Sequence, residues 1–215
     1  MKKQVMNFLS MALMALVLFS CDGGGKKGGG KSLFTPVSSG HPYEMLVVID
    51  KDMWERPAGR ALFNALDMDV PGLPQPERSF RISQIIPDKF ERGFRIFRNI
   101  IDVDIQPIYT QPKLKYSRDS YASPQMIMTI QAPDEASFEE FVNQNKQVIV
   151  DFFTKAEMNR QINLLKEKYS DVVATKVGSM FGCDVRVPVG FERYKQGKDF
   201  FWTSEDRPGS EVSMN

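Results

Sequence analysis

Apolar residues recur along most of this chain with the spacings of short strands and amphipathic helices. Short apolar runs, several rich in β-branched residues, predict strands at residues 43–49, 79–85, 96–105, 125–132, 183–187 and 200–204. In the third run Ile101, Val103 and Ile105 alternate with Asp102 and Asp104, so the two carboxylates should share one face of a strand. Residues 106–124 are polar and are predicted to form a long loop.

Helical spacing fills most of the intervals between these runs. Helices are expected at residues 57–68, at 87–93, along a long stretch that starts after Asp134, and at 171–181. Helix-end residues support these limits: Asp50, Asp52, Asp134 and Ser170 are candidate N-caps, Pro57 suits a first turn, and Gly182 suits a C-terminus. This alternation predicts one α+β domain over residues 42–215, with a mixed or antiparallel sheet and helices packed on one face. A ferredoxin-like arrangement is expected for its first part.

The N-terminus has the pattern of an export signal. Lys2 and Lys3 precede an apolar segment, Phe8–Phe19, that is too short for a spanning helix of roughly 20 residues and suits a secretory signal. The segment ends in Leu18-Phe19-Ser20-Cys21, which resembles the bacterial lipobox. That resemblance implies a signal peptide at residues 1–20 and lipid on Cys21, the first residue of the mature protein. The alternative is an ordinary signal peptide followed by a chance cysteine.

Residues 21–41 are rich in glycine and lysine and predict a flexible linker between the lipid and the domain. Within it, Gly25–Ser32 satisfies the P-loop pattern G-x-x-x-x-G-K-[ST]. A phosphate-binding loop needs a strand before it and a helix after it, and neither is predicted here. The sequence therefore argues against a nucleotide-binding site.

Composition restricts the chemistry further. The chain carries 28 Lys and Arg against 27 Asp and Glu, so no basic excess favours nucleic acid. With Cys21 assigned to lipid, Cys183 is a lone thiol, and the single histidine, His41, offers no Cys/His cluster for zinc. No cofactor, metal or intramolecular disulfide is expected.

The polar loop is the strongest candidate for a binding surface. It mixes aromatic rings with cations, at Tyr109, Lys113, Lys115, Tyr116, Arg118 and Tyr121. Alternatively, the tyrosines fold back over the sheet and the cations are solvated. Trp54 and Arg60 flank the start of the first helix, where an anion could bind. Alternatively, Trp54 belongs to the core and Arg60 forms a surface ion pair.

Asp102 and Asp104 are the candidate carboxylates for hydrolysis, but a catalytic pair needs surroundings that separate the two pKa values. Nothing near them in sequence supplies such surroundings, so a solvated strand face is the preferred interpretation. The predicted function is therefore a non-catalytic binding or scaffolding role, with an envelope protein or glycan as partner. The alternative is an envelope hydrolase that uses carboxylates.

Several segments are similar to an uncharacterised lipoprotein family of Bacteroides-type bacteria, domain-of-unknown-function family 4837. They are Trp54–Phe63, Asp69–Gln75, Phe97–Ile101, Tyr109–Lys115 and Ala122–Met126. The resemblance implies an envelope lipoprotein, brings no activity, and implies a chain truncated at its C-terminus. An outer-membrane anchor is expected. The domain is expected to face the periplasm, because Cys21 is not followed by an acidic run of the kind with which such bacteria send lipoproteins to the cell surface.

Overall fold

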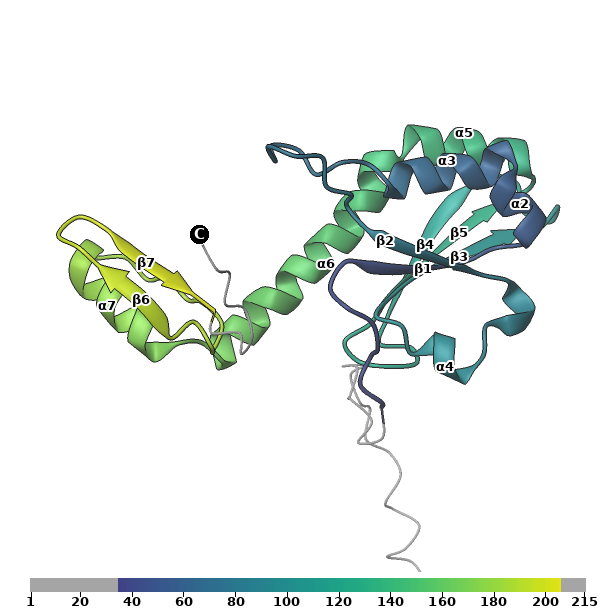
Figure 1. Ribbon diagram of the computed structural model, residues 1–215. Helices are drawn as coiled ribbons and strands as arrows, with labels where there is room; N and C mark the ends of the chain where they lie inside the picture. Colours follow the sequence, from purple (N-terminus) through teal and green to yellow (C-terminus); the bar gives the residue numbers. More distant parts are fainter. Residues whose placement is uncertain (1–34, 206–215) are drawn as a thin grey trace, which may run out of the picture. The chain divides into compact units, whose positions relative to one another are not determined.

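The computed structural model describes residues 35–205 (Figure 1). Cys21, the signal segment and most of the predicted linker lie outside the described residues. The main sheet has the order β2-β1-β3-β5-β4. Its strands are β1 (Glu44–Val48), β2 (Arg81–Ile85), β3 (Asn99–Ile105), β4 (Lys113–Arg118) and β5 (Met126–Ala132).

The helices are named here in chain order. They are α2 (Lys51–Glu55), α3 (Pro57–Leu66), the 3-10 turn η1 (Pro87–Lys89), α4 (Arg92–Arg95), α5 (Glu135–Gln144), α6 (Lys146–Glu167) and α7 (Asp171–Phe181). A separate two-stranded antiparallel sheet follows, made of β6 (Arg193–Gln196) and β7 (Phe201–Ser204). The α+β class, with a mixed sheet and helices packed against it, is confirmed.

The ferredoxin-like expectation is wrong. β1 pairs in parallel with both β2 and β3, β3 pairs in parallel with β5, and only β4 is antiparallel to its neighbour. The connections explain this difference. α2 and α3 lie between β1 and β2, and η1 and α4 lie between β2 and β3, so each connection crosses back over the sheet and returns the chain in the same direction.

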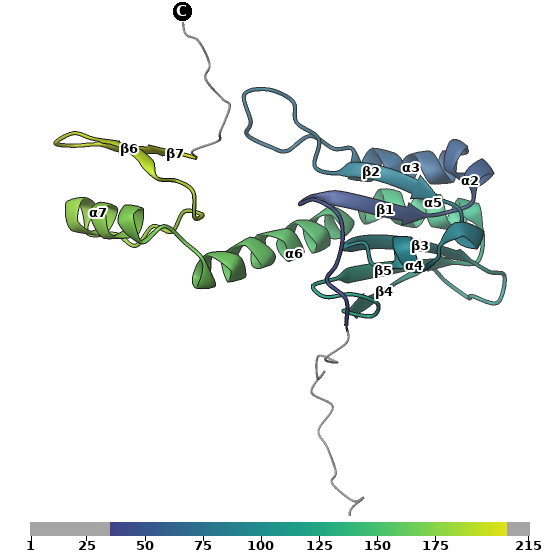
Figure 2. The same ribbon diagram turned by 60° about the horizontal axis from the view of Figure 1, so that its bottom comes forward.

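The two faces of the sheet are covered differently. On one face Met45, Val47 and Ile49 pack in the main core, with buried residues of α3, α5 and α6 such as Leu62, Phe138 and Phe153. On the other face a smaller cluster of Leu46, Val48, Ile85, Ile100 and Ile127 is covered by Phe90 and Phe97. Figure 1 shows α3 and α5 together on one side of the sheet and α4 on the other, and Figure 2 shows the order of the strands from β2 to β4. β1 is therefore buried on both faces, as its unbroken apolar run predicts.

Three of the predicted N-caps and the predicted C-terminal glycine are confirmed, whereas Asp52 lies within the first turn of α2 and does not cap it. The Asp50 carboxylate accepts from the backbone N–H groups of Asp52 and Met53, and that of Asp134 accepts from Ser137. The Ser170 hydroxyl accepts from the Val173 N–H at the start of α7. Gly182 ends α7 with a left-handed φ of 67°, which glycine adopts without strain.

Two predictions of local structure are wrong. Residues 106–124 are not one loop, because β4 lies within them; as an edge strand it needs only one neighbour and shows no strong apolar alternation. Residues 183–187 are not a strand. They find no ladder partner, and the hairpin forms instead between β6 and β7.

Candidate functional site

The predicted binding residues around β4 are divided between the two faces of the sheet. Lys113 and Lys115 point to the face opposite the main helices, while Tyr116 and Arg118 alternate onto the helix face. The Tyr116 ring lies 4.7 Å from that of Phe152 on α6. Tyr116 nevertheless stays 52% exposed, so its ring covers part of the sheet edge and also faces solvent.

Tyr121 lies beyond β4 in a separate aromatic contact. Its ring meets Phe90 edge-on at 6.2 Å, and the Arg95 guanidinium lies 5.4 Å from its centroid. Tyr121 therefore packs against the η1–α4 segment and does not lie beside Tyr116.

Trp54 and Arg60 come together on a single ring. Trp54 meets Phe63 edge-on at 5.8 Å, and the Arg60 guanidinium lies 4.1 Å from the centroid of the same ring. Trp54 also packs against the main core. These contacts give both side chains a packing role.

β4 lies at the edge of the main sheet. It pairs with β5 along one side only, and among residues 35–205 no strand pairs with its other side. Lys113, Lys115 and Arg118 are exposed along it. We call Lys113, Lys115, Tyr116 and Arg118, with the unpaired backbone of β4, the edge surface.

The face of the sheet opposite α3, α5 and α6 carries a second group of polar side chains, at the carboxyl ends of β3 and β5. Parallel pairing sets Asp102 beside Thr129, and Asp104 beside Gln131. The Tyr109 hydroxyl donates to Asp104 at 2.5 Å, and the Gln131 amide donates to Asp104 at 2.7 Å. We call Asp102, Asp104, Tyr109, Lys115 and Gln131 the polar cluster.

The two carboxyl groups of the polar cluster titrate differently. Burial raises the pKa of Asp102 above its usual value, and the neighbouring charge of Asp104 raises it further. Burial would also raise the pKa of Asp104, but hydrogen bonds from Tyr109, Gln131 and Gln106, with the charge of Lys115, lower it overall. No residue near Asp102 and Asp104 in the sequence predicts this separation of the two pKa values. It follows from long-range pairing, since Gln131 lies on another strand.

Gln131 is the functional candidate that sequence reasoning missed. It is 4% exposed, and its Oε1 has no hydrogen-bond partner among the described residues. Its one sequence signal is a glutamine inside a strand that is otherwise apolar. A buried, unpaired acceptor is costly, and it marks a place where a ligand could supply a donor.

A buried ionic network lies at the other end of β3. Glu157 of α6 is fully buried and accepts from Arg98 at 2.8 Å and from Arg160 and Asn99 at 2.7 Å each. The Arg160 guanidinium also donates to Asn99 and to the Arg98 carbonyl. Among the described residues only Arg98 Nε of this network is buried without a hydrogen-bond partner, and the other contacts join α6 to the sheet.

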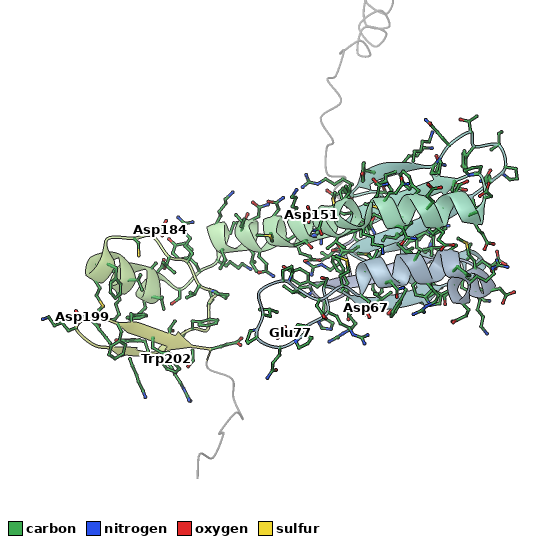
Figure 3. The ribbon with its side chains drawn as sticks, turned by 90° about the horizontal axis from the view of Figure 1, so that it is seen from above. Asp67, Glu77, Asp151, Asp184, Asp199 and Trp202 are labelled. Atoms are coloured by element: carbon green, nitrogen blue, oxygen red, sulfur yellow. The ribbon has the colours of Figure 1, made fainter. Side chains whose placement is uncertain are left out.

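An open groove of about 1070 Å³ lies near the start of β1 and β2, lined by residues that include His41, Asp67 and Glu77. Figure 3 labels Asp67 and Glu77. Arg78 pairs with Asp67 at 3.0 Å across its wall. The charges of this wall thus compensate one another.

Every helix within residues 35–205 is too short or too polar to span a lipid bilayer. The same residues contain no group of three or more His, Cys, Asp or Glu side chains placed to hold a metal ion.

One family model matches the chain. It is described as "Domain of unknown function (DUF8532)" and covers residues 38–166, so the chain belongs to that family. The matched region includes β1 to β5 and nearly all of α6, and therefore both the edge surface and the polar cluster. No curated protein and no solved structure matches.

Proposed function

We propose that this member of the DUF8532 family is a lipid-anchored envelope lipoprotein with a non-catalytic binding role, and that the edge surface binds an extended segment of a partner protein. The anchor is supported by the lipobox-like Leu18–Cys21 segment and by the resemblance to domain-of-unknown-function family 4837. An outer-membrane location facing the periplasm belongs to the same proposal.

The observation that carries the binding role is the unpaired outer side of β4. An edge strand presents free N–H and C=O groups that a peptide can join as an additional strand. Lysines often protect such edges from pairing. Here the positive charges of Lys113, Lys115 and Arg118 favour an acidic partner, because an acidic peptide neutralises them and a basic peptide is repelled. The partner segment is therefore extended and acidic.

Site-specific cross-linking tests the edge surface. A photoreactive amino acid replaces Ser117 on β4 in the full-length lipoprotein in cells, and a matched replacement of Ser83 on β2 probes the opposite edge of the sheet. An adduct is expected from position 117 and not from position 83. Lys113→Glu with Arg118→Glu should abolish it, whereas equal adducts from both edges would contradict strand addition.

The anchor has its own test. Radiolabelled palmitate should enter the wild-type chain and not a Cys21→Ser variant. Protease treatment of intact cells then distinguishes the two faces of the outer membrane, since a periplasmic domain survives it. Equal labelling of both chains would contradict the lipid anchor.

A carboxylate hydrolase is the second candidate, because the surroundings of Asp102 and Asp104 separate their pKa values as acid–base pairs require. Against it, both oxygens of Asp104 already accept hydrogen bonds, from Gln106, Tyr109 and Gln131. A panel of chromogenic glycosides and esters tests this alternative. Turnover that Asp102→Asn abolishes would favour the hydrolase over the binding role.

A further inference from the structure

Two acceptors of the polar cluster have no donor within the part of the protein that the structure describes. Among the described residues no side chain or backbone group hydrogen-bonds to the Asp102 carboxyl, and Gln131 Oε1 is buried without a donor. The Gln131 amide nitrogen is already used, since it donates to Asp104 and to the Tyr109 oxygen. A ligand that completes this site must therefore bring donors.

The charges of the polar cluster further restrict the class of ligand that can bind. Asp104 acts on Asp102 as a like charge, whereas the positive charge of Lys115 acts on Asp104. Asp104 is also stabilised by three hydrogen bonds, and Asp102 by none. Asp102 thus lacks a counter-ion, and a cationic donor would supply both the missing charge and the missing hydrogen bonds.

A metal ion fits this arrangement less well. The hydrogens of Gln106, Tyr109 and Gln131 point at the oxygens of Asp104, and they would repel a cation that tried to share those oxygens. An ammonium group needs neither Asp104 oxygen. It can donate to Asp102 and to Gln131 Oε1 with separate hydrogens.

We propose that the polar cluster binds a primary ammonium group, with Asp102 as its counter-ion and Gln131 Oε1 as its second acceptor. Tyr109, on the connection between β3 and β4, borders this site and donates its hydroxyl hydrogen to Asp104. The position agrees with the general preference of open sheets for ligands at the carboxyl ends of parallel strands. The site shares Lys115 with the edge surface but uses carboxylate and amide acceptors and needs no free backbone.

The ammonium group can come from a lysine side chain or from an amino sugar. Titration calorimetry on the full mature lipoprotein in detergent micelles separates the two, with Nα-acetyl-lysine methylamide and glucosamine as probes. N-acetylglucosamine, which lacks the ammonium group, and calcium chloride serve as negative probes. At least one of the two amines should bind saturably, and neither negative probe should bind.

Asp102→Asn is the decisive variant, because asparagine keeps the shape and removes the counter-charge. The affinity for the amine should fall about tenfold or more, in line with the loss of a buried charge pair. Asp199→Asn, on the exposed connection between β6 and β7 and labelled in Figure 3, is the matched control and should bind as the wild type does. Tyr109→Phe should also retain binding, because its hydroxyl serves Asp104 and not the ligand.

Three results would overturn the proposal. The first is the absence of saturable binding by either amine. The second is equal affinity in the wild type and in Asp102→Asn, whose melting temperature reports that the fold is intact. The third is competition by calcium or N-acetylglucosamine at the same site, which would indicate a metal or polyol site instead.

Discussion

Replacing Glu157 with glutamine removes the negative charge that Arg98 and Arg160 share beneath α6. The carboxylate is fully buried, whereas the two arginine side chains are 15% and 10% exposed. Burial, with the nearby charge of Arg98, already lowers the pKa of Arg160 in spite of Glu157. Without Glu157 the two guanidinium groups would face each other with no compensating charge in contact.

The contacts of Glu157 indicate how much the free energy of unfolding should fall when it is replaced. Glu157 accepts hydrogen bonds at 2.8 Å from Arg98 and at 2.7 Å from both Arg160 and Asn99. Removing one partner from a buried ion pair costs about 3–5 kcal/mol. Glutamine retains one acceptor oxygen, so we expect a loss of about 3 kcal/mol, a large part of the roughly 5–15 kcal/mol that stabilises a domain.

Urea unfolding followed by far-ultraviolet circular dichroism measures the effect. With a slope of about 2 kcal/mol per molar urea, a loss of about 3 kcal/mol lowers the midpoint by about 1.5 M. Glu167→Gln, at the exposed end of the same helix, is the matched control and should change stability by less than about 0.5 kcal/mol.

A second substitution makes the reasoning refutable. Arg160→Met in the Glu157→Gln background removes one of the uncompensated charges and should restore part of the lost stability. If Glu157→Gln matches the control, or if the added Arg160→Met lowers stability further, then charge compensation is not what the network contributes.

Three other substitutions test separate parts of the fold. Burial raises the pKa of Asp102, so its ionisation weakens the folded state as pH rises through that pKa; Asp102→Asn should raise the melting temperature at pH 7 and have little effect below about pH 4. Asp104 has a lowered pKa, so its contribution is present at neutral pH and is lost as pH falls through the folded value; Asp104→Asn should lower the melting temperature at pH 7. Gly59→Ala would put a Cβ 2.3 Å from the Met53 carbonyl oxygen, so urea unfolding should show destabilisation in spite of the gain in helix propensity of about 1 kcal/mol. A more stable Gly59→Ala chain would show that α2 and α3 can separate freely.

Local signals in the sequence predicted much of the fold. The apolar run of β1 identified a central strand because both faces of that strand are buried. Asp50, Asp134 and Ser170 marked helix starts because each satisfies backbone N–H groups within its own turn. These features depend on residues a few positions apart, and a sequence displays such spacings directly.

Features that depend on distant pairing were not predicted. The parallel direction of β1, β2 and β3 follows from where the connecting helices pack. The spacing of apolar residues within each strand does not predict it. The buried position of Glu157 was also hidden, because the charge lies in a helix whose polar and apolar residues show almost no sidedness over its full length. Its arginine partners include Arg98, which lies far away in the chain.

The Tyr and Lys segment shows how composition alone can mislead about a site. Its residues suggested one binding loop, but strand geometry turns Lys115 towards Asp104 and Tyr116 towards Phe152. A substitution at Tyr116 therefore reports on the contact with α6, whereas one at Lys115 changes the charge beside the polar cluster. Replacing the whole segment at once would combine these effects with those on the β4 edge. The edge is tested cleanly by Ser117 and Arg118, which lie opposite Ile127 and Met126 of β5, whereas Lys113 lies opposite Gln131 of the polar cluster.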